Sequence, residues 1–189
     1  MHDLDALIYR GCRVMARLGG WMLLLTGSGV AVEVVLRKLF AVSVGGANEL
    51  SSYAFAVGAS WAFAFTLLER GHIRIDAVYQ YVPRRVRIFL DFLALFLLLV
   101  FVAYWAWRAS VMLAGTIDIG ARANTPLGTP LWIPQLLWVV GLAIFLAVGL
   151  RLFVRSLILL FQRQTDELSA LIGTPGSESH AAGRRPDGR

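Results

Sequence analysis

Residues 88–113, IFLDFLALFLLLVFVAYWAWRASVML, hold one acid near their start, Asp91, and one base near their end, Arg108. Every residue between these two charges is aliphatic or aromatic. About 20 mostly apolar residues are enough for a helix to cross the hydrocarbon core of a bilayer. Because lipid offers no partners for backbone N–H and C=O groups, a single crossing segment must be helical. The stretch therefore predicts a membrane-spanning helix.

Three further apolar stretches predict three more spans. They are 18–36, interrupted only by Glu33, the uncharged stretch 50–68, and 131–161, which is uncharged until Arg151. The last would be about 46 Å long as a straight helix, longer than the bilayer core, so it must tilt or project from the membrane. The chain is 58% hydrophobic and only 16% charged, whereas soluble domains carry about 25% charged residues.

These stretches predict an all-α integral membrane protein with four transmembrane helices. Residues 1–163 form its single membrane domain. The remaining segment, 164–189, is rich in Gly, Ser, Pro and charge, a composition typical of disorder, and we expect a disordered cytoplasmic tail there.

The orientation follows from the arginines and lysines beside the spans, since basic residues accumulate on the cytoplasmic side. One side of the predicted membrane carries Arg10, Arg13, Arg17, Arg70, Arg74, Arg84, Arg85, Arg87, Arg151, Arg155, Arg163, Arg184, Arg185 and Arg189. The other side carries Arg37, Lys38, Arg108 and Arg122. We therefore expect both termini inside the cell, with the connections 37–48 and 113–130 outside.

Several classes of function are disfavoured. The net charge of +6 comes from residues that flank the spans, not from a basic surface interleaved with aromatics, so nucleic-acid binding is not expected. Of His2, His72 and His180 only His72 lies near a span, which excludes a pair of axial haem ligands within this chain. No zinc-ligand cluster, phosphate-binding loop or nucleophile motif is present in the sequence. We expect neither an enzyme nor a cofactor or metal site.

A carrier that binds its own substrate usually shows repeats and helices broken at mid-membrane. No span centre here is broken by Pro or by a Gly pair. The chain is therefore expected to work beside a partner. Two other classes stay open: a membrane anchor for a respiratory or other redox complex, and a small channel, although no span carries a continuous polar stripe.

Polar residues at the outer ends of the first two spans are candidate structural or interface residues. Glu33 precedes Arg37 by four residues, a spacing that favours an ion pair on one helix face. Glu49 follows Asn48, which can cap the second span. The carboxylate either complements the helix dipole or makes a polar contact with another helix or subunit. We expect Arg37 and Glu49 to lie close together and to hold the first two helices in register.

The second span also carries Ala54, Gly58 and Ala62 at four-residue intervals. Such small-residue stripes allow close approach of helices, either within one subunit or between subunits.

The connection before the third span carries His72, Arg74 and Asp76 in alternation with Ile73 and Ile75. It is either a solvated spacer or an interfacial support with its isoleucines against lipid or partner. Pro83 is placed to start the third helix, because proline is favoured in the first turn.

Three groups of residues resemble one known family. The first is EVVLRKLF, residues 33–40, followed by NELSSY, 48–53. The second is ERGHIRID, 69–76, followed by VPRR, 82–85, and the third is TPLGTPLWIP, 125–134. Their order and spacing over residues 14–161 resemble the DctQ-type small membrane subunit of tripartite ATP-independent periplasmic (TRAP) transporters.

The resemblance implies a role that the residues alone do not. In such systems a periplasmic binding protein delivers an organic acid to a large membrane subunit, which moves it with sodium ions. The small subunit is a fixed scaffold beside the moving part of its partner, in the inner membrane of a bacterium and in contact with lipids. Substrate and sodium sites would then lie in the large subunit.

Overall fold

The computed structural model describes residues 2–40, 46–69 and 83–162. They form four helices: α1 (His2–Phe40), α2 (Ala47–Leu68), α4 (Arg84–Asp118) and α5 (Trp132–Phe161). All four are long and apolar enough to span a membrane. The described ranges contain no strand, only an isolated β-bridge between Arg122 and Pro130. The all-α fold with four candidate spans is therefore confirmed.

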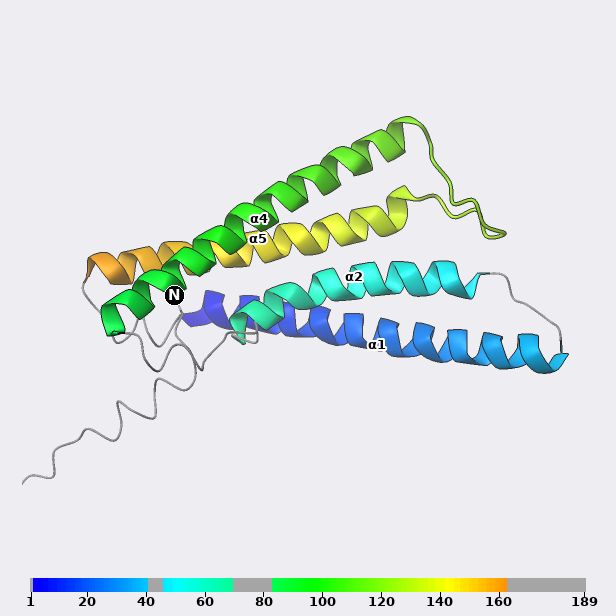
Figure 1. Ribbon diagram of the computed structural model, residues 1–189, viewed down its shortest axis with the longest axis horizontal. Coiled ribbons are helices and arrows are strands. Elements are labelled where there is room, and N and C mark those ends of the chain that lie inside the picture. The colour runs from blue at the N-terminus through cyan, green and yellow to red at the C-terminus, as the bar shows by residue number, and fades with distance from the viewer. Residues whose placement is uncertain (1, 41–45, 70–82, 163–189) are drawn as a thin grey trace, which may run out of the picture.

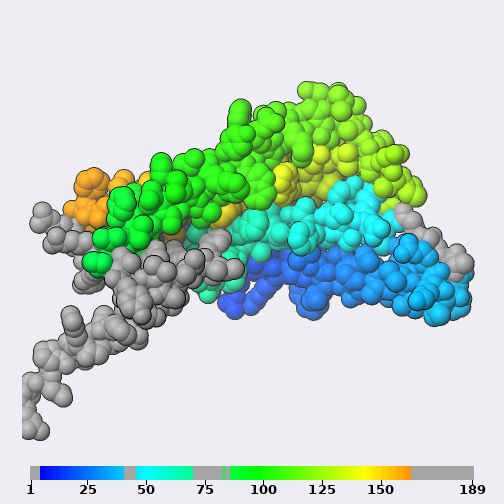
Figure 2. All heavy atoms as spheres, in the orientation of Figure 1, coloured from blue at the N-terminus to red at the C-terminus, as the bar shows by residue number. Residues whose placement is uncertain are grey.

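The order of the helices in space differs from their order in the chain. α1 packs against α2, α2 against α5, and α5 against α4, so α5 lies between α2 and α4 (Figure 1). α1 and α4 form the two long edges of the molecule (Figure 2). The edge helices expose large apolar side chains such as Trp21, Leu24, Phe89 and Phe101, as expected for surfaces that meet lipid or other apolar partners.

Glycines set the closest approaches between helices. A Cβ on Gly19 of α1 would lie 2.8–2.9 Å from the backbone of Gly58 in α2, so the two main chains touch there. Gly141 of α5 makes room in the same way for Ser60 and Trp61 of α2. Without a hydrophobic driving force in lipid, such contacts are a main source of helix association.

Aromatic rings fill the space between the other helices. Phe63 of α2 lies 5.6 Å from Phe145 of α5 and 6.1 Å from Trp105 of α4, measured between ring centroids. Trp105 in turn meets Trp138 of α5 edge-on at 5.9 Å. Edge-to-face and tilted pairs at these separations add stabilisation beyond the burial of area. This aromatic cluster joins three of the four helices.

Several helices extend beyond the predicted spans, and the extension is longest at the N-terminal end of α1 and at the C-terminal end of α4. α1 begins at His2 and not near residue 18, because its first turns pack against other helices of the bundle. α4 continues past Leu113 to Asp118, where Gly120 adopts a positive φ of 59°. The N–H of Ala121 donates to the Thr116 carbonyl, and the N–H of Gly120 donates to the Ile117 carbonyl. These two bonds form a Schellman motif, which favours glycine at its left-handed position.

The other helix ends lie within about four residues of the predicted spans. α5, Trp132–Phe161, starts one residue after the predicted 131–161 and ends with it, and α2 contains the predicted span 50–68. The predicted tail, 164–189, lies outside the described residues.

Candidate functional site

Glu49, in the first turn of α2, is a buried carboxylate that joins distant parts of the chain. Tyr53, one turn further along α2, donates its hydroxyl to Glu49 Oε1 at 2.9 Å. Thr125, in the connection between α4 and α5, donates its hydroxyl to Oε2. Thr129, in the same connection, lies close enough to interact with the same carboxylate. We call Glu49, Tyr53, Thr125 and Thr129 the Glu49 junction.

The connection from 119 to 131 is shaped to reach this carboxylate. Ala123 donates its N–H to Thr129, and Leu131 donates to Ala121, so the segment doubles back as a short hairpin. Its turn closes with a bond from the Gly128 N–H to Thr125. The Leu127 side chain lies directly over Gly46, where a Cβ would come within 2.4 Å of it. The hairpin therefore seats on the start of α2 by apolar as well as polar contacts.

One expectation for this region is wrong. Asn48 does not cap α2, because the helix starts at Ala47, with Gly46, two residues before Asn48, at the cap position and no side-chain cap bond. The backbone carbonyl of Asn48 instead accepts hydrogen bonds from the hydroxyls of Ser51 and Ser52. The predicted proximity of Arg37 and Glu49 stays a prediction: Arg37 is exposed in the last turn of α1, and the bonds that the described residues make to the carboxylate come from Tyr53 and the hairpin.

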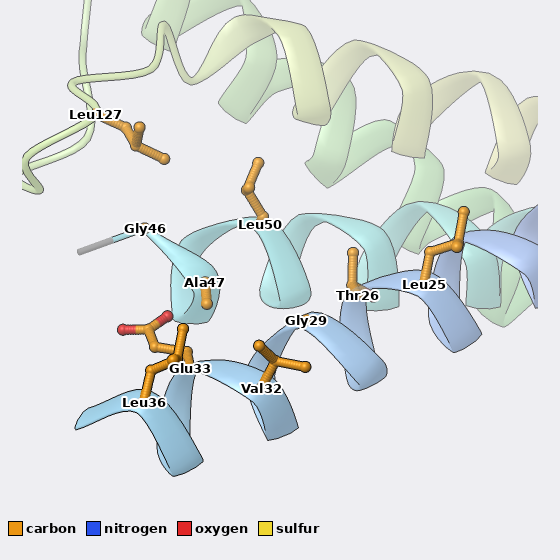
Figure 3. Close-up of a pocket in the computed structure, with 10 residues that line it drawn as sticks. All are labelled: Leu25, Thr26, Gly29, Val32, Glu33, Leu36, Gly46, Ala47, Leu50 and Leu127. Carbon is orange, nitrogen blue, oxygen red and sulfur yellow. The ribbon is translucent and has the colours of Figure 1, made fainter. Parts of the chain in front are cut away.

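A groove of about 350 Å³ runs between the second half of α1 and the start of α2. Leu25, Val32 and Leu36 line it from α1, Leu50 lines it from α2, and Leu127 lies over its end (Figure 3). Glu33 also lines it, half-buried, and its side chain extends toward the first turn of α2 (Figure 3). The predicted ion pair between Glu33 and Arg37 stays a prediction.

The small-residue stripe of α2 serves contacts within the chain. Gly58 meets Gly19 of α1 main chain to main chain. Ala54 is buried and Ala62 is half-buried. Of the two alternatives left open by the sequence, packing inside one subunit accounts for Gly58.

A family model for the DctQ component of tripartite ATP-independent periplasmic transporters matches residues 27–159. The match includes α1 from residue 27 onward, all of α2 and α4, and nearly all of α5. The chain belongs to the DctQ family. It is thus a TRAP transporter small membrane subunit, as the resemblance implied. Searches of curated proteins and of solved structures returned no match.

Two of the sequence stretches that resemble the DctQ family meet in space. Glu49 and Tyr53 belong to NELSSY, and Thr125 and Thr129 belong to TPLGTPLWIP. They are 76 residues apart along the chain. The Glu49 junction is therefore where these two stretches of the DctQ chain contact each other.

Sequence reasoning missed a second polar junction in this DctQ chain, at the opposite end of the helices. Asp5 of α1 forms ion pairs with two arginines of α5, at 2.7 Å to Arg151 and 3.5 Å to Arg155. Nearby, Tyr9 donates its hydroxyl to Glu69 at the end of α2, at 2.6 Å. No local pattern indicates these pairs, because Asp5 and Arg151 are 146 residues apart.

The remaining candidates fall at the other connection of the DctQ chain. Pro83 immediately precedes α4, and its carbonyl accepts the N–H of Arg87. His72, Arg74 and Asp76 lie outside the described residues. Among the residues that the structure does describe, no group of three or more His, Cys, Asp or Glu side chains could hold a metal ion.

Proposed function

We propose that this chain is the non-catalytic scaffold of a TRAP transporter in the inner membrane of a bacterium. It holds a large membrane subunit in place while that subunit moves an organic acid together with sodium ions. A periplasmic binding protein delivers the acid and contacts the complex transiently. Membership of the DctQ family supports the transporter role, and the packing of the four helices supports the scaffold role.

The observation that carries the scaffold proposal is that side-chain contacts join the helices at both ends and at a point between them. At one end the Glu49 junction joins α2 to the short hairpin that connects α4 and α5, residues 119–131. In the middle, Trp61 of α2 donates its indole N–H to the Leu137 carbonyl of α5 at 3.0 Å. At the other end Asp5 ties α1 to α5. A bundle of helices joined in this way resists the internal rearrangement that alternating access requires.

The exposed surfaces of the helices also suit a supporting role. In the α1 span only 6% of the residues are buried within the chain, against 22–33% in the other three spans. Transport of an organic anion requires polar or cationic groups along its path. The groove beside α1, by contrast, is lined mainly by aliphatic side chains. We infer that the uncovered apolar faces meet lipid and the large subunit, and that the transport path lies in that subunit.

Deletion and complementation test the proposal. Cells lacking this chain should lose sodium-dependent uptake of the organic acid, and the wild-type chain should restore it. An affinity-tagged chain in mild detergent should recover a large multi-span protein. Gly19→Leu, which forces α1 from α2, should reduce both uptake and recovery, whereas Gly20→Leu, at an open neighbouring position, should leave both near the wild-type level.

The competing class is a membrane anchor of a redox complex. The purified complex would then show a haem absorption band or a redox enzyme in place of the large transporter subunit. Unchanged uptake in the deletion strain would count against the transporter role itself.

A further inference from the structure

A second groove lies near the opposite end of the helices, between the first half of α1 and the second half of α5. Its volume is about 350 Å³. Ile8, Gly11, Cys12 and Met15 line it from α1, with Ala147 and Arg151 among the residues that line it from α5. The α1 positions follow the i, i+3, i+4, i+7 spacing of a single helix face. We call this the α1/α5 groove.

The floor of the α1/α5 groove is apolar and its sides are open. Cys12 and Val148 are buried at its base, with exposures of 3% and 7%. Gly11 has no atom within 4 Å of where a Cβ would stand, and Ala147 is exposed. The groove therefore has room for a slender apolar chain along the helix axes.

One end of the groove is cationic. Arg151 both lines the groove and bonds Asp5, and Arg155 follows one turn later with 52% of its side chain exposed. Among the described residues, Asp5 is the one carboxylate paired with these two guanidinium groups, and it occupies only part of their N–H donors. Positive charge and hydrogen-bond donors are thus left over at the mouth of the groove.

We propose that the α1/α5 groove binds one anionic phospholipid. An acyl chain lies against Ile8, Cys12 and Met15, and the phosphate lies at Arg151 and Arg155. The charge distribution favours this occupant over a partner helix, because the groove joins an apolar slot to a surplus of arginine, as a lipid joins a hydrocarbon tail to an anionic head. Basic pockets between membrane helices bind lipid headgroups in this way. The α1 residues of the groove precede residue 27, where the family match begins.

Thermal unfolding of the full chain in detergent tests the proposal, with dioleoyl phosphatidylglycerol and dioleoyl phosphatidylcholine as the two probes. A ligand that binds only the folded state raises the melting temperature with its concentration. Phosphatidylglycerol is expected to raise it at lower concentrations than phosphatidylcholine. Arg155→Gln, which keeps the bond from Arg151 to Asp5, should raise the phosphatidylglycerol concentration required by about fivefold.

Filling the groove separates this site from general lipid effects. Gly11→Leu should abolish the preference for phosphatidylglycerol, whereas Gly20→Leu, an equally open position on α1 outside the groove, should retain it. If Gly11→Leu fails to insert, Ala147→Leu on the facing helix supplies the same test.

Three results would overturn the proposal. The first is an equal response of the wild-type chain to the two lipids. The second is an unchanged preference in the groove-filling variants. The third is loss of the large membrane subunit from Gly11→Leu while the lipid preference persists, which would assign the groove to a partner helix.

Discussion

Glu49 receives bonds from its own helix and from a hairpin 76 residues away. Its position at the start of an apolar stretch marked it as a candidate from sequence. Its partners could not be inferred, because Thr125 and Thr129 are unremarkable polar residues in a connection and nothing local relates them to Glu49. Arg37 was chosen from sequence for its opposite charge at the end of the first span, but the hydroxyls of Tyr53 and Thr125 already bond the carboxylate, so no cation is needed to accommodate it.

A double-mutant cycle tests this assignment. Glu49→Gln and Thr125→Val should each lower the free energy of unfolding. Their effects should be coupled by about 0.6 kcal/mol and by no more than about 1.7 kcal/mol, the average and the maximum found for hydrogen bonds between membrane helices. Unfolding free energies in detergent provide the measurement. Glu49→Gln with Arg37→Gln should be additive, and significant coupling there would restore the original pairing.

The second polar junction gives another residue-scale prediction. Asp5→Asn should destabilise the chain, because it removes the anion that lies between Arg151 and Arg155. Both arginines are partly exposed, so the loss should be small, about 1 kcal/mol or less. It should shrink further in high salt, because ions screen partly exposed charges. Thermal unfolding at low and high salt concentrations provides the check, and a salt-independent loss would argue against an ionic cause.

At the scale of the helix, hydropathy was a good guide to the segments that cross the membrane and a poor guide to where each helix ends. The spans 50–68, 88–113 and 131–161 all lie within or nearly coincide with helices. The ends of α1 and α4 were missed, because a helix outside lipid is maintained by capping and packing and not by apolar composition. Gly120 was a usable signal that was overlooked, since glycine is common just after a helix C-terminus.

The crossing of α1 and α2 leads to the prediction at this scale. Gly19→Ala would place a methyl group within 3 Å of the Gly58 backbone, which must move to accommodate it. Overpacking of this kind costs about 1–3 kcal/mol. Gly20→Ala, with open space around it, is the matched control. Equal melting temperatures for the two variants would contradict the close crossing.

At the scale of the whole molecule, the sequence indicated four spans and a family but not which helices are neighbours. Apolar faces in lipid do not select one another by hydrophobicity, so neighbours are set by shape, by small residues and by a few polar contacts. The relevant contacts join Gly19 to Gly58 and Ser60 to Gly141, pairs that no periodicity connects. The orientation across the membrane likewise remains a prediction from the arginine distribution.

Labelling of intact cells tests that orientation. In a Cys12→Ser background, which removes the only cysteine, a cysteine is introduced at Asn124 or at Gln162, both exposed positions. A membrane-impermeant maleimide should label Asn124→Cys directly and Gln162→Cys only after permeabilisation. The reverse labelling pattern would place both termini of the chain outside the cell.

The position of α5 between α2 and α4 has a consequence for biosynthesis. Of the four helices it is the last to leave the ribosome, yet it is the one that both of its neighbours require. Until α5 is synthesised and inserts between them, the faces of α2 and α4 that contact α5 in the folded protein are exposed to lipid. Ribosomes that stall before Trp132 would therefore release a chain whose inserted helices lack their common neighbour, a natural substrate for membrane proteases.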